Sequence, residues 1–426
     1  MLSIDIKNSK SSPVKFLKNI EKRHQDFYKV IDDKKAFEKI EKLAKKLKNN
    51  FKYFVVLGIG GSALGTICLK NALKPIDHEK LFVIDNIDPD FIKEVENKID
   101  LKKTLFIVVS KSGDTLETLS QFFYFHKKIK DKKLDVKKHF IFITDPKKGL
   151  LRELSKKEKY ETLDVPKNVG GRFSVLTAVS LFPAMLIGID IKKIITGAQK
   201  MRNKFLSKDA KKNLPFLLAK TQYDFYKKGF KTNVLFPYSN SLSDFSNWTV
   251  QLICESTGKK SKGITIIKAL GATDQHAQSQ LFHEGPNDKL IIFFEIENFK
   301  NTLKIPNEIA KSLTFAKLLN IEKSSTEKSL QKENRPTLTI KLDKISEENL
   351  GELFMLFEGS TAFLGEFFEI NAFNQPGVEH SKKLTKQAII NLGGFTKNKQ
   401  QLKETHSQNH CEVFLKKKNS WKLKLR

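Results

Sequence analysis

Eight short apolar runs, spaced by longer stretches of mixed sequence, constrain the fold of this chain more than any other feature. Four lie in each half: YFVVLG (53–58), LFVI (81–84), TLFIVV (104–109), HFIFIT (139–144), NVLF (233–236), ITIIKAL (264–270), KLIIFFEI (289–296) and TLTIKL (337–342). Strands that alternate with helices form βαβ units, in which the strands lie parallel. The sequence therefore predicts an α/β protein with a helix-flanked parallel sheet in each half.

The length of the chain supports two domains rather than one. It has 426 residues, whereas a single hydrophobic core rarely grows past roughly 250–300 residues. An apolar stretch that contains Pro183 predicts a buried helix at the end of the first half, and the Phe-rich and Leu-rich stretch from Glu352 to Glu369 predicts a core helix in the second. We predict an amino-terminal helical segment, two α/β domains and a lysine-rich extension, at residues 1–50, 51–192, 193–395 and 396–426.

The chain carries a formal net charge of +29, which has two interpretations. A basic face can bind the phosphate backbone of a nucleic acid. The lysines, however, accompany abundant Asn, Ile and Phe, a mixture that codon bias across a genome also produces. We therefore favour a positive field that concentrates a small anionic substrate over a nucleic-acid site.

Cysteine usage and hydropathy predict where the protein resides. Cys68, Cys254 and Cys411 lie far apart without a CxxC pair, which favours a reduced compartment over a disulfide scaffold or a zinc cluster. No run reaches the ~18 apolar residues of a membrane span, and the amino terminus lacks the apolar centre of a signal peptide. We expect a soluble cytoplasmic protein without a membrane partner.

A glycine-rich loop follows the first apolar run and opens a predicted helix. Gly60, Gly61 and Ser62 allow a ligand to approach backbone N–H groups at a helix N-terminus, where an anion is favoured. The spacing Gly58-x-Gly60-x-x-Ala also fits a relaxed dinucleotide pattern, with Asp85 as the ribose-binding acid. A plain strand-to-helix turn is the third interpretation, so this loop alone does not identify the ligand.

The third apolar run ends in a second loop that favours a phosphorylated substrate. Hydroxyls and one lysine gather there before the next predicted helix, as expected of a phosphate site: Ser110, Lys111, Ser112 and Thr115. A dinucleotide enzyme needs no second phosphate site at this position, whereas a small phosphosugar does. A helix cap without a ligand is the alternative. Asp114 is not assigned as a ligand because a carboxylate repels a phosphate.

Four further segments, with the two loops, resemble the glucose-6-phosphate isomerase (phosphoglucose isomerase) family in the same order. They are Gly170–Ser174 (GGRFS), Glu255–Lys259 (ESTGK), Asp274–Ala277 (DQHA) and Gln375–Glu379 (QPGVE), which runs on to Lys382. The resemblance covers roughly residues 50–390. It implies two sugar-isomerase (SIS) domains, a homodimer with shared active sites and a phosphorylated hexose as substrate, without metal or organic cofactor.

The resemblance also implies catalytic roles that suit the residue types. Moving a carbonyl between C1 and C2 needs a base, which Glu255 matches, and a fixed cation beside the enediolate oxygen, which Arg172 matches. His276 and Lys382 match the residues that open the sugar ring, and Gln375 matches a substrate-positioning glutamine.

His276, His283 and Glu284 give no clear set of ligands on one helix face, so no metal is predicted. Two other functions within the same fold remain open. One is an isomerase of another phosphosugar, such as mannose 6-phosphate, which would share the base and the phosphate loop. The other is a phosphosugar-binding regulator without catalysis, which would not need Glu255, Arg172, His276 and Lys382 together. A dinucleotide oxidoreductase ranks last.

Overall fold

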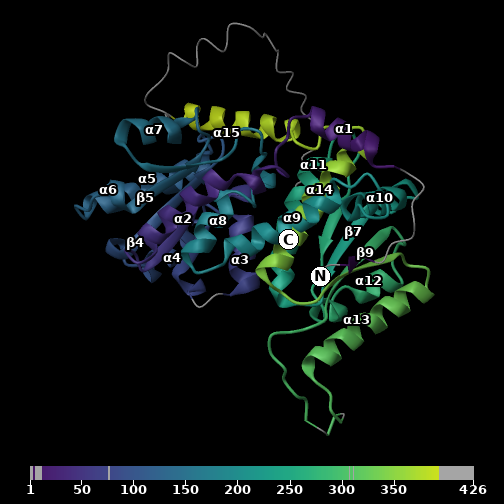
Figure 1. Cartoon of the computed structure of the whole chain (residues 1–426). Helices are drawn as coiled ribbons and strands as arrows, with labels where there is room; N and C mark the ends of the chain where they lie inside the picture. Colours follow the sequence, from purple (N-terminus) through teal and green to yellow (C-terminus); the bar gives the residue numbers. More distant parts are fainter. Residues whose placement is uncertain (1–2, 5–11, 75–76, 307, 310, 393–426) are drawn as a thin grey trace, which may run out of the picture. The chain divides into compact units, whose positions relative to one another are not determined.

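Two five-stranded sheets organise the chain and confirm the predicted α/β fold. The computed structural model describes residues 3–4, 12–74, 77–306, 308–309 and 311–392, which fall into two units, Met1–Asn374 and Gln375–Arg426. Both sheets lie in the first unit (Figure 1). The first sheet is entirely parallel, in the order β3 (Leu81–Ile84), β2 (Tyr53–Leu57), β4 (Thr104–Ser110), β5 (Phe140–Thr144) and β6 (Glu161–Asp164).

The second sheet has four parallel strands and one antiparallel edge strand. Its order is β1 (Ser3–Ile4), β10 (Thr337–Leu342), β9 (Lys289–Ile296), β7 (Thr232–Pro237) and β8 (Thr265–Lys268). β1 pairs antiparallel with β10. The amino-terminal segment, predicted to be helical, thus also contributes a strand, which was missed because two residues are too short to show a period.

Side chains of the first sheet alternate between two helical layers, as they do in a parallel sheet buried on both faces. On one side the core includes α2 (Lys34–Lys48), α3 (Leu64–Leu73) and α8 (Ala178–Leu186). On the other side it includes α4 (Pro89–Lys98), α5 (Leu116–Asp131) and α7 (Leu150–Glu158). The short helix α6 (Val136–His139) leads into β5.

The second sheet is covered in the same way. One face packs on α11 (Ser243–Thr257) and α14 (Glu347–Phe367), and the other on α12 (Ser279–His283) and α13 (Phe315–Lys332), which runs beside β9 in Figure 1. The helix predicted around Glu352 is α14, in which every residue from Asn349 to Glu366 is buried. The remaining helices of this unit are α1 (Val14–Lys22), α9 (Ile191–Phe205) and α10 (Leu214–Lys227).

Glycines let α9 and α14 meet backbone to backbone. A Cβ on Gly351 would lie 1.9 Å from the carbonyl oxygen of Ile194, and one on Gly197 would lie 1.8 Å from that of Glu348. One cluster of buried side chains therefore extends from the first sheet through these helices to the second. This continuous core fixes the loops of both sheets relative to one another.

The second unit, Gln375–Arg426, is described by itself. The second unit contains η8 (Pro376–Val378) and α15 (Glu379–Asn391). The basic extension, residues 396–426, lies outside the described residues. Within the part of the chain that the structure describes, no helix is long and apolar enough to cross a membrane.

Candidate active site

The glycine loop lies directly against the segment that carries Arg172. It forms η2 (Gly60–Ser62) after β2, and the GGRFS segment forms η5 (Gly171–Phe173). A Cβ on Gly61 would lie 2.3 Å from the carbonyl oxygen of Gly171, a distance that no real side chain tolerates. Glycine at this position therefore permits the close approach of the two loops.

Arg172 and Glu255 form an ion pair at the carboxyl-terminal end of α11. Arg172 Nη1 lies 3.6 Å from Glu255 Oε2, and Arg172 is buried. Its Nε donates to Ser256 Oγ at 2.7 Å, and its Nη2 donates to the carbonyl oxygens of Ala372 and Asn374 at 2.5 and 3.1 Å. Burial lowers the pKa of Arg172 from its usual value, while Glu255 opposes this shift. The guanidinium is therefore held in one orientation beside the carboxylate.

Gln251 is a site residue that the sequence analysis missed. It lies one helical turn before Glu255, and its Nε2 donates to Glu255 Oε2 at 3.3 Å. A Cβ on Gly60 would lie 2.8 Å from the same Nε2, so the amide sits between the glycine loop and the carboxylate. The i,i+4 spacing of Gln251 and Glu255 on a predicted helix was the available signal.

Three hydroxyls gather in the loop between β4 and α5. Ser110 Oγ lies 2.8 Å from Thr115 Oγ1 and 3.4 Å from Ser112 Oγ, and the Ser112 and Thr115 hydroxyls are 3.4 Å apart. Burial lowers the pKa of the neighbouring Lys111, and so do the charges of Lys148 and Arg172, while Asp145 opposes them. Hydroxyls at a helix N-terminus within a positive field are suited to binding a phosphate.

Asp114 has a structural partner outside the hydroxyl cluster. Its Oδ1 accepts a hydrogen bond of 2.9 Å from the backbone N–H of Leu150, at the start of α7. A Cβ on Gly149 would lie 2.0 Å from the carbonyl oxygen of Ser112, so the two loops are in backbone contact. The carboxylate therefore caps a neighbouring helix, which accounts for an acid in a loop predicted to bind phosphate.

His276 is not joined to the Arg172–Glu255 pair within one chain. It ends η7 (Thr273–His276), is exposed, and makes no side-chain hydrogen bond or ion pair with any described residue. The preceding Gln275 Nε2 donates to Thr326 Oγ1 of α13 at 2.9 Å, which anchors this turn. His283 instead lies 2.8 Å from Glu333, through Nδ1 and Oε2.

Gln375 and Lys382 belong to the second unit and are described there alone. Gln375 precedes η8, and Lys382 Nζ lies 3.0 Å from Glu379 Oε1 on α15. The functional roles of both residues stay predictions.

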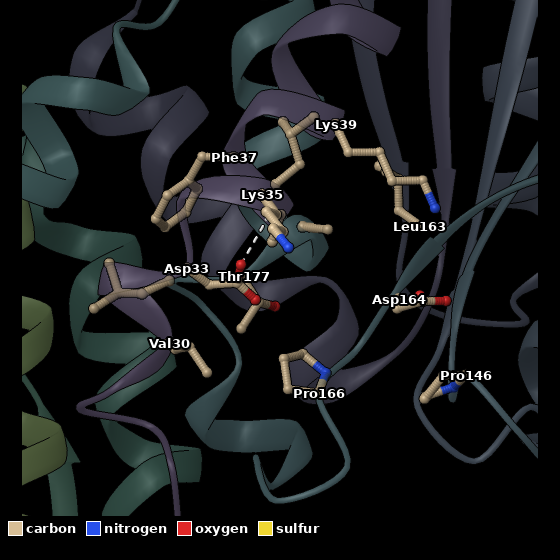
Figure 2. Close-up of a pocket in the computed structure, with 14 residues that line it drawn as sticks. Val30, Asp33, Lys35, Phe37, Lys39, Pro146, Leu163, Asp164, Pro166 and Thr177 are labelled. Atoms are coloured by element: carbon tan, nitrogen blue, oxygen red, sulfur yellow. Dashed lines mark hydrogen bonds between the residues drawn. The ribbon is translucent and has the colours of Figure 1, made fainter.

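The cavity drawn in Figure 2 lies away from these residues. It has a volume of about 410 Å³ and is lined by α2, by the end of β6 and by the segment before α8. Phe37, Leu163 and Pro166 are among its lining residues, whereas none of the predicted catalytic or substrate-binding residues is. A mostly apolar wall does not suit a phosphosugar, so we assign no substrate to this cavity.

Comparisons with known proteins agree with the site residues in pointing to one family. A model of the family described as phosphoglucose isomerase matches residues 16–407. The chain is 39% identical over 391 residues to a glucose-6-phosphate isomerase of Carboxydothermus hydrogenoformans, covering 85% of this chain and 84% of that protein. It is 38% identical over 358 residues to a probable glucose-6-phosphate isomerase of Methanococcus maripaludis, covering 82% and 81%.

Solved structures share the fold of this chain. A hypothetical protein from Thermus thermophilus superimposes with a TM-score of 0.83 at 32% identity, covering 91% of this chain and 100% of that one. A glucose-6-phosphate isomerase from Chlamydia trachomatis has a TM-score of 0.75 at 23% identity, covering 94% and 79%, and shows the same fold. Because the family model spans most of the chain, this protein belongs to the phosphoglucose isomerase family.

Proposed function

We propose that this chain catalyses the reversible isomerisation of glucose 6-phosphate and fructose 6-phosphate. The observation that supports it most is the buried Arg172 beside Glu255, with 3.6 Å between Nη1 and Oε2, next to the glycine loop. Such a pair offers a proton acceptor and a fixed cation at one point, as an enediolate intermediate requires. The family to which the chain belongs supports the same reaction.

In this mechanism Glu255 transfers the proton between the two carbons. Starting from the aldose, its carboxylate takes the proton from C2, electrons move towards the C1 oxygen, and an enediolate forms. Glu255 then returns the proton to C1 while the hydroxyl proton of O2 passes to O1, which leaves a hydroxyl at C1 and the carbonyl at C2. Arg172 stabilises the negative oxygen because its guanidinium stays protonated. The Gln251 amide, 3.3 Å from Glu255 Oε2, orients the carboxylate.

The phosphate of the substrate would bind at the loop after β4. Ser110, Ser112 and Thr115 offer three hydroxyls within 3.4 Å of one another, and Lys111 adds a positive charge. A dianionic phosphate would relieve the repulsion between this lysine and its cationic neighbours. The loop therefore accounts for a preference for phosphorylated hexoses. Gly60, Gly61 and Ser62 would contact the sugar from the facing loop.

Ring opening would require His276, Lys382 and a second copy of the chain. His276 is exposed and has no partner among the described residues, as expected if it serves a site on a neighbouring subunit. Large apolar side chains are exposed on α13 and in the segment before it, which supports a homodimer: Leu303, Ile309, Phe315 and Ile321 are 60%, 73%, 57% and 51% exposed. We further place the reaction in the cytoplasm, since Cys68 and Cys254 are free thiols.

The variant Glu255→Gln tests the proposed chemistry directly. It keeps the shape of the side chain but removes the proton carrier, so we expect isomerisation to fall by about 10²–10⁴-fold while substrate binding is retained. The measurements are a coupled assay with fructose 6-phosphate and incorporation of solvent deuterium at C2. Exchange at the wild-type rate in the variant would assign the base to another residue. Turnover of mannose 6-phosphate in preference to fructose 6-phosphate by the wild type would favour a different phosphosugar.

A further inference from the structure

A lysine with no assigned role closes the end of the helix that carries Glu255. Lys259 Nζ donates to the backbone carbonyl oxygen of Glu255 at 3.0 Å and to that of Ser256 at 2.6 Å. The turn that positions it is held by two backbone hydrogen bonds between Lys259 and Lys262, of 3.1 and 2.9 Å. Lys259 is half-buried, as expected of a side chain that lies along the helix end.

The location of Glu255 makes this contact important for chemistry. Glu255 is in the last turn of α11, which ends at Thr257. The carbonyl end of a helix carries a partial negative charge, which opposes a carboxylate and an anionic transition state in the same turn. A cation that hydrogen-bonds these carbonyls cancels part of that charge.

We propose that Lys259 is a positioning residue for the isomerisation proposed above: its ammonium group neutralises the carbonyl end of α11 and thereby holds Glu255 and Ser256 against Arg172. The connection to Arg172 is direct, because Arg172 Nε donates to Ser256 Oγ at 2.7 Å. Without the ammonium group, the last turn of α11 would lose two hydrogen bonds and the charge that offsets its carbonyls. Lys259 therefore acts through Glu255 and Arg172 and does not itself touch the reacting carbons.

The protonation of Lys259 can be followed within an accessible pH range. Burial first, and then the charge of Arg172, lower the pKa of Lys259 to about 8, while Glu255 opposes the shift. Among the residues that the structure describes, Arg172 of η5 and Glu255 of α11 are the charged groups that shift this pKa. The ammonium form is present below this pKa and is lost as the pH rises through it. The turnover number kcat should therefore decline above about pH 8.

Two substitutions at Lys259 separate charge from shape. In Lys259→Met we expect kcat at pH 7 to fall about tenfold or more, with a smaller change in KM, because the pair moves while the phosphate loop is intact. Lys259→Arg keeps a cation at every pH tested. It should recover most of kcat and shift the alkaline decline by at least about one pH unit upwards. A purely structural cap would not produce this shift.

Lys262→Met is the matched control, because Lys262 lies in the same turn but donates to the carbonyl oxygen of Phe368, at 2.8 Å. We expect its kcat to stay within about twofold of the wild type.

Equal kcat values in Lys259→Met and Lys262→Met, or an alkaline decline that stays in place in Lys259→Arg, would overturn the proposal. A decline caused by Lys111 would appear in kcat/KM and persist in Lys259→Arg. If Lys259→Met does not fold, the upward shift of the alkaline decline in kcat of Lys259→Arg tests the proposal by itself. An inactive wild type would instead refute the proposed function.

Discussion

At the scale of single residues, the site depends on contacts that leave no room for extra atoms. Gly61 and Gly171 show this because they face each other across the two loops, yet only Gly171 has space for an added Cβ. A Cβ on Gly61 would lie 2.3 Å from the Gly171 carbonyl oxygen, whereas a Cβ on Gly171 would have no atom within 4 Å. The close approach thus depends on one glycine of the pair.

We predict that Gly61→Ala destabilises the protein by about 1–3 kcal/mol, because the η2 and η5 loops must separate to admit the methyl group. The displaced η5 would carry Arg172 with it, so activity should fall as well. Gly171→Ala is the control and should leave the unfolding free energy nearly unchanged. Chemical denaturation of both variants measures the difference. Equal stability of the two variants would contradict the close approach of the loops.

At the scale of elements, the site is assembled from loops that contact and hydrogen-bond one another. Asp114 in the loop after β4 accepts a hydrogen bond from the Leu150 backbone N–H at the start of α7. A side chain of the hydroxyl-bearing loop therefore caps the helix that follows β5. Asp33 performs the same function for α2, accepting from the Ala36 backbone at 3.0 Å. The two caps are chemically alike but lie in different surroundings.

We predict that Asp114→Ala and Asp33→Ala each cost about 0.5–2 kcal/mol of stability, the usual range for a lost helix cap. Only Asp114→Ala should also raise KM for phosphorylated substrate, because Ser112 and Thr115 lose the anchor of their loop. Steady-state kinetics and thermal unfolding of the two variants provide the comparison. A rise in KM of the same size in Asp33→Ala would show that the effect is general destabilisation.

At the scale of the whole molecule, the proposed dimer makes a prediction that single-chain contacts cannot supply. If His276 serves the site of the neighbouring subunit, then a mixed dimer of Glu255→Gln and His276→Ala has one site with both defects and one with neither. Activity should therefore return to nearly half that of the wild-type dimer. Co-expression with two affinity tags, followed by isolation of the mixed species, gives the measurement. A mixed dimer that assembles but stays inactive would place both residues in the same chain's site.

The fold class and the order of the site segments follow from the sequence alone. A strand buried on both faces appears as a continuous apolar run, which is why all eight predicted runs, such as 104–109 and 289–296, contain strands in the structure. Loops that follow parallel strands lie at the same edge of the sheet, and the structure places β2, which precedes the glycine loop, directly beside β4, which precedes the hydroxyl loop. β6 was missed because its sequence, ETLD, buries only one residue fully and therefore lacks an apolar run.

The contacts that hold the site together depend instead on tertiary packing. Arg172 is bound by the Ala372 carbonyl, 200 residues away, and Gln251 lies against Gly60 from a different sheet's helix. The cap that Asp114 provides for α7 and the contact of Lys259 with the end of α11 likewise depend on how loops meet after packing. Local periodicity reports whether a residue is buried, but not which distant backbone group it faces. Which group it faces depends on how the elements pack against one another. Here that packing depends on close backbone contacts at Gly61, Gly197 and Gly351.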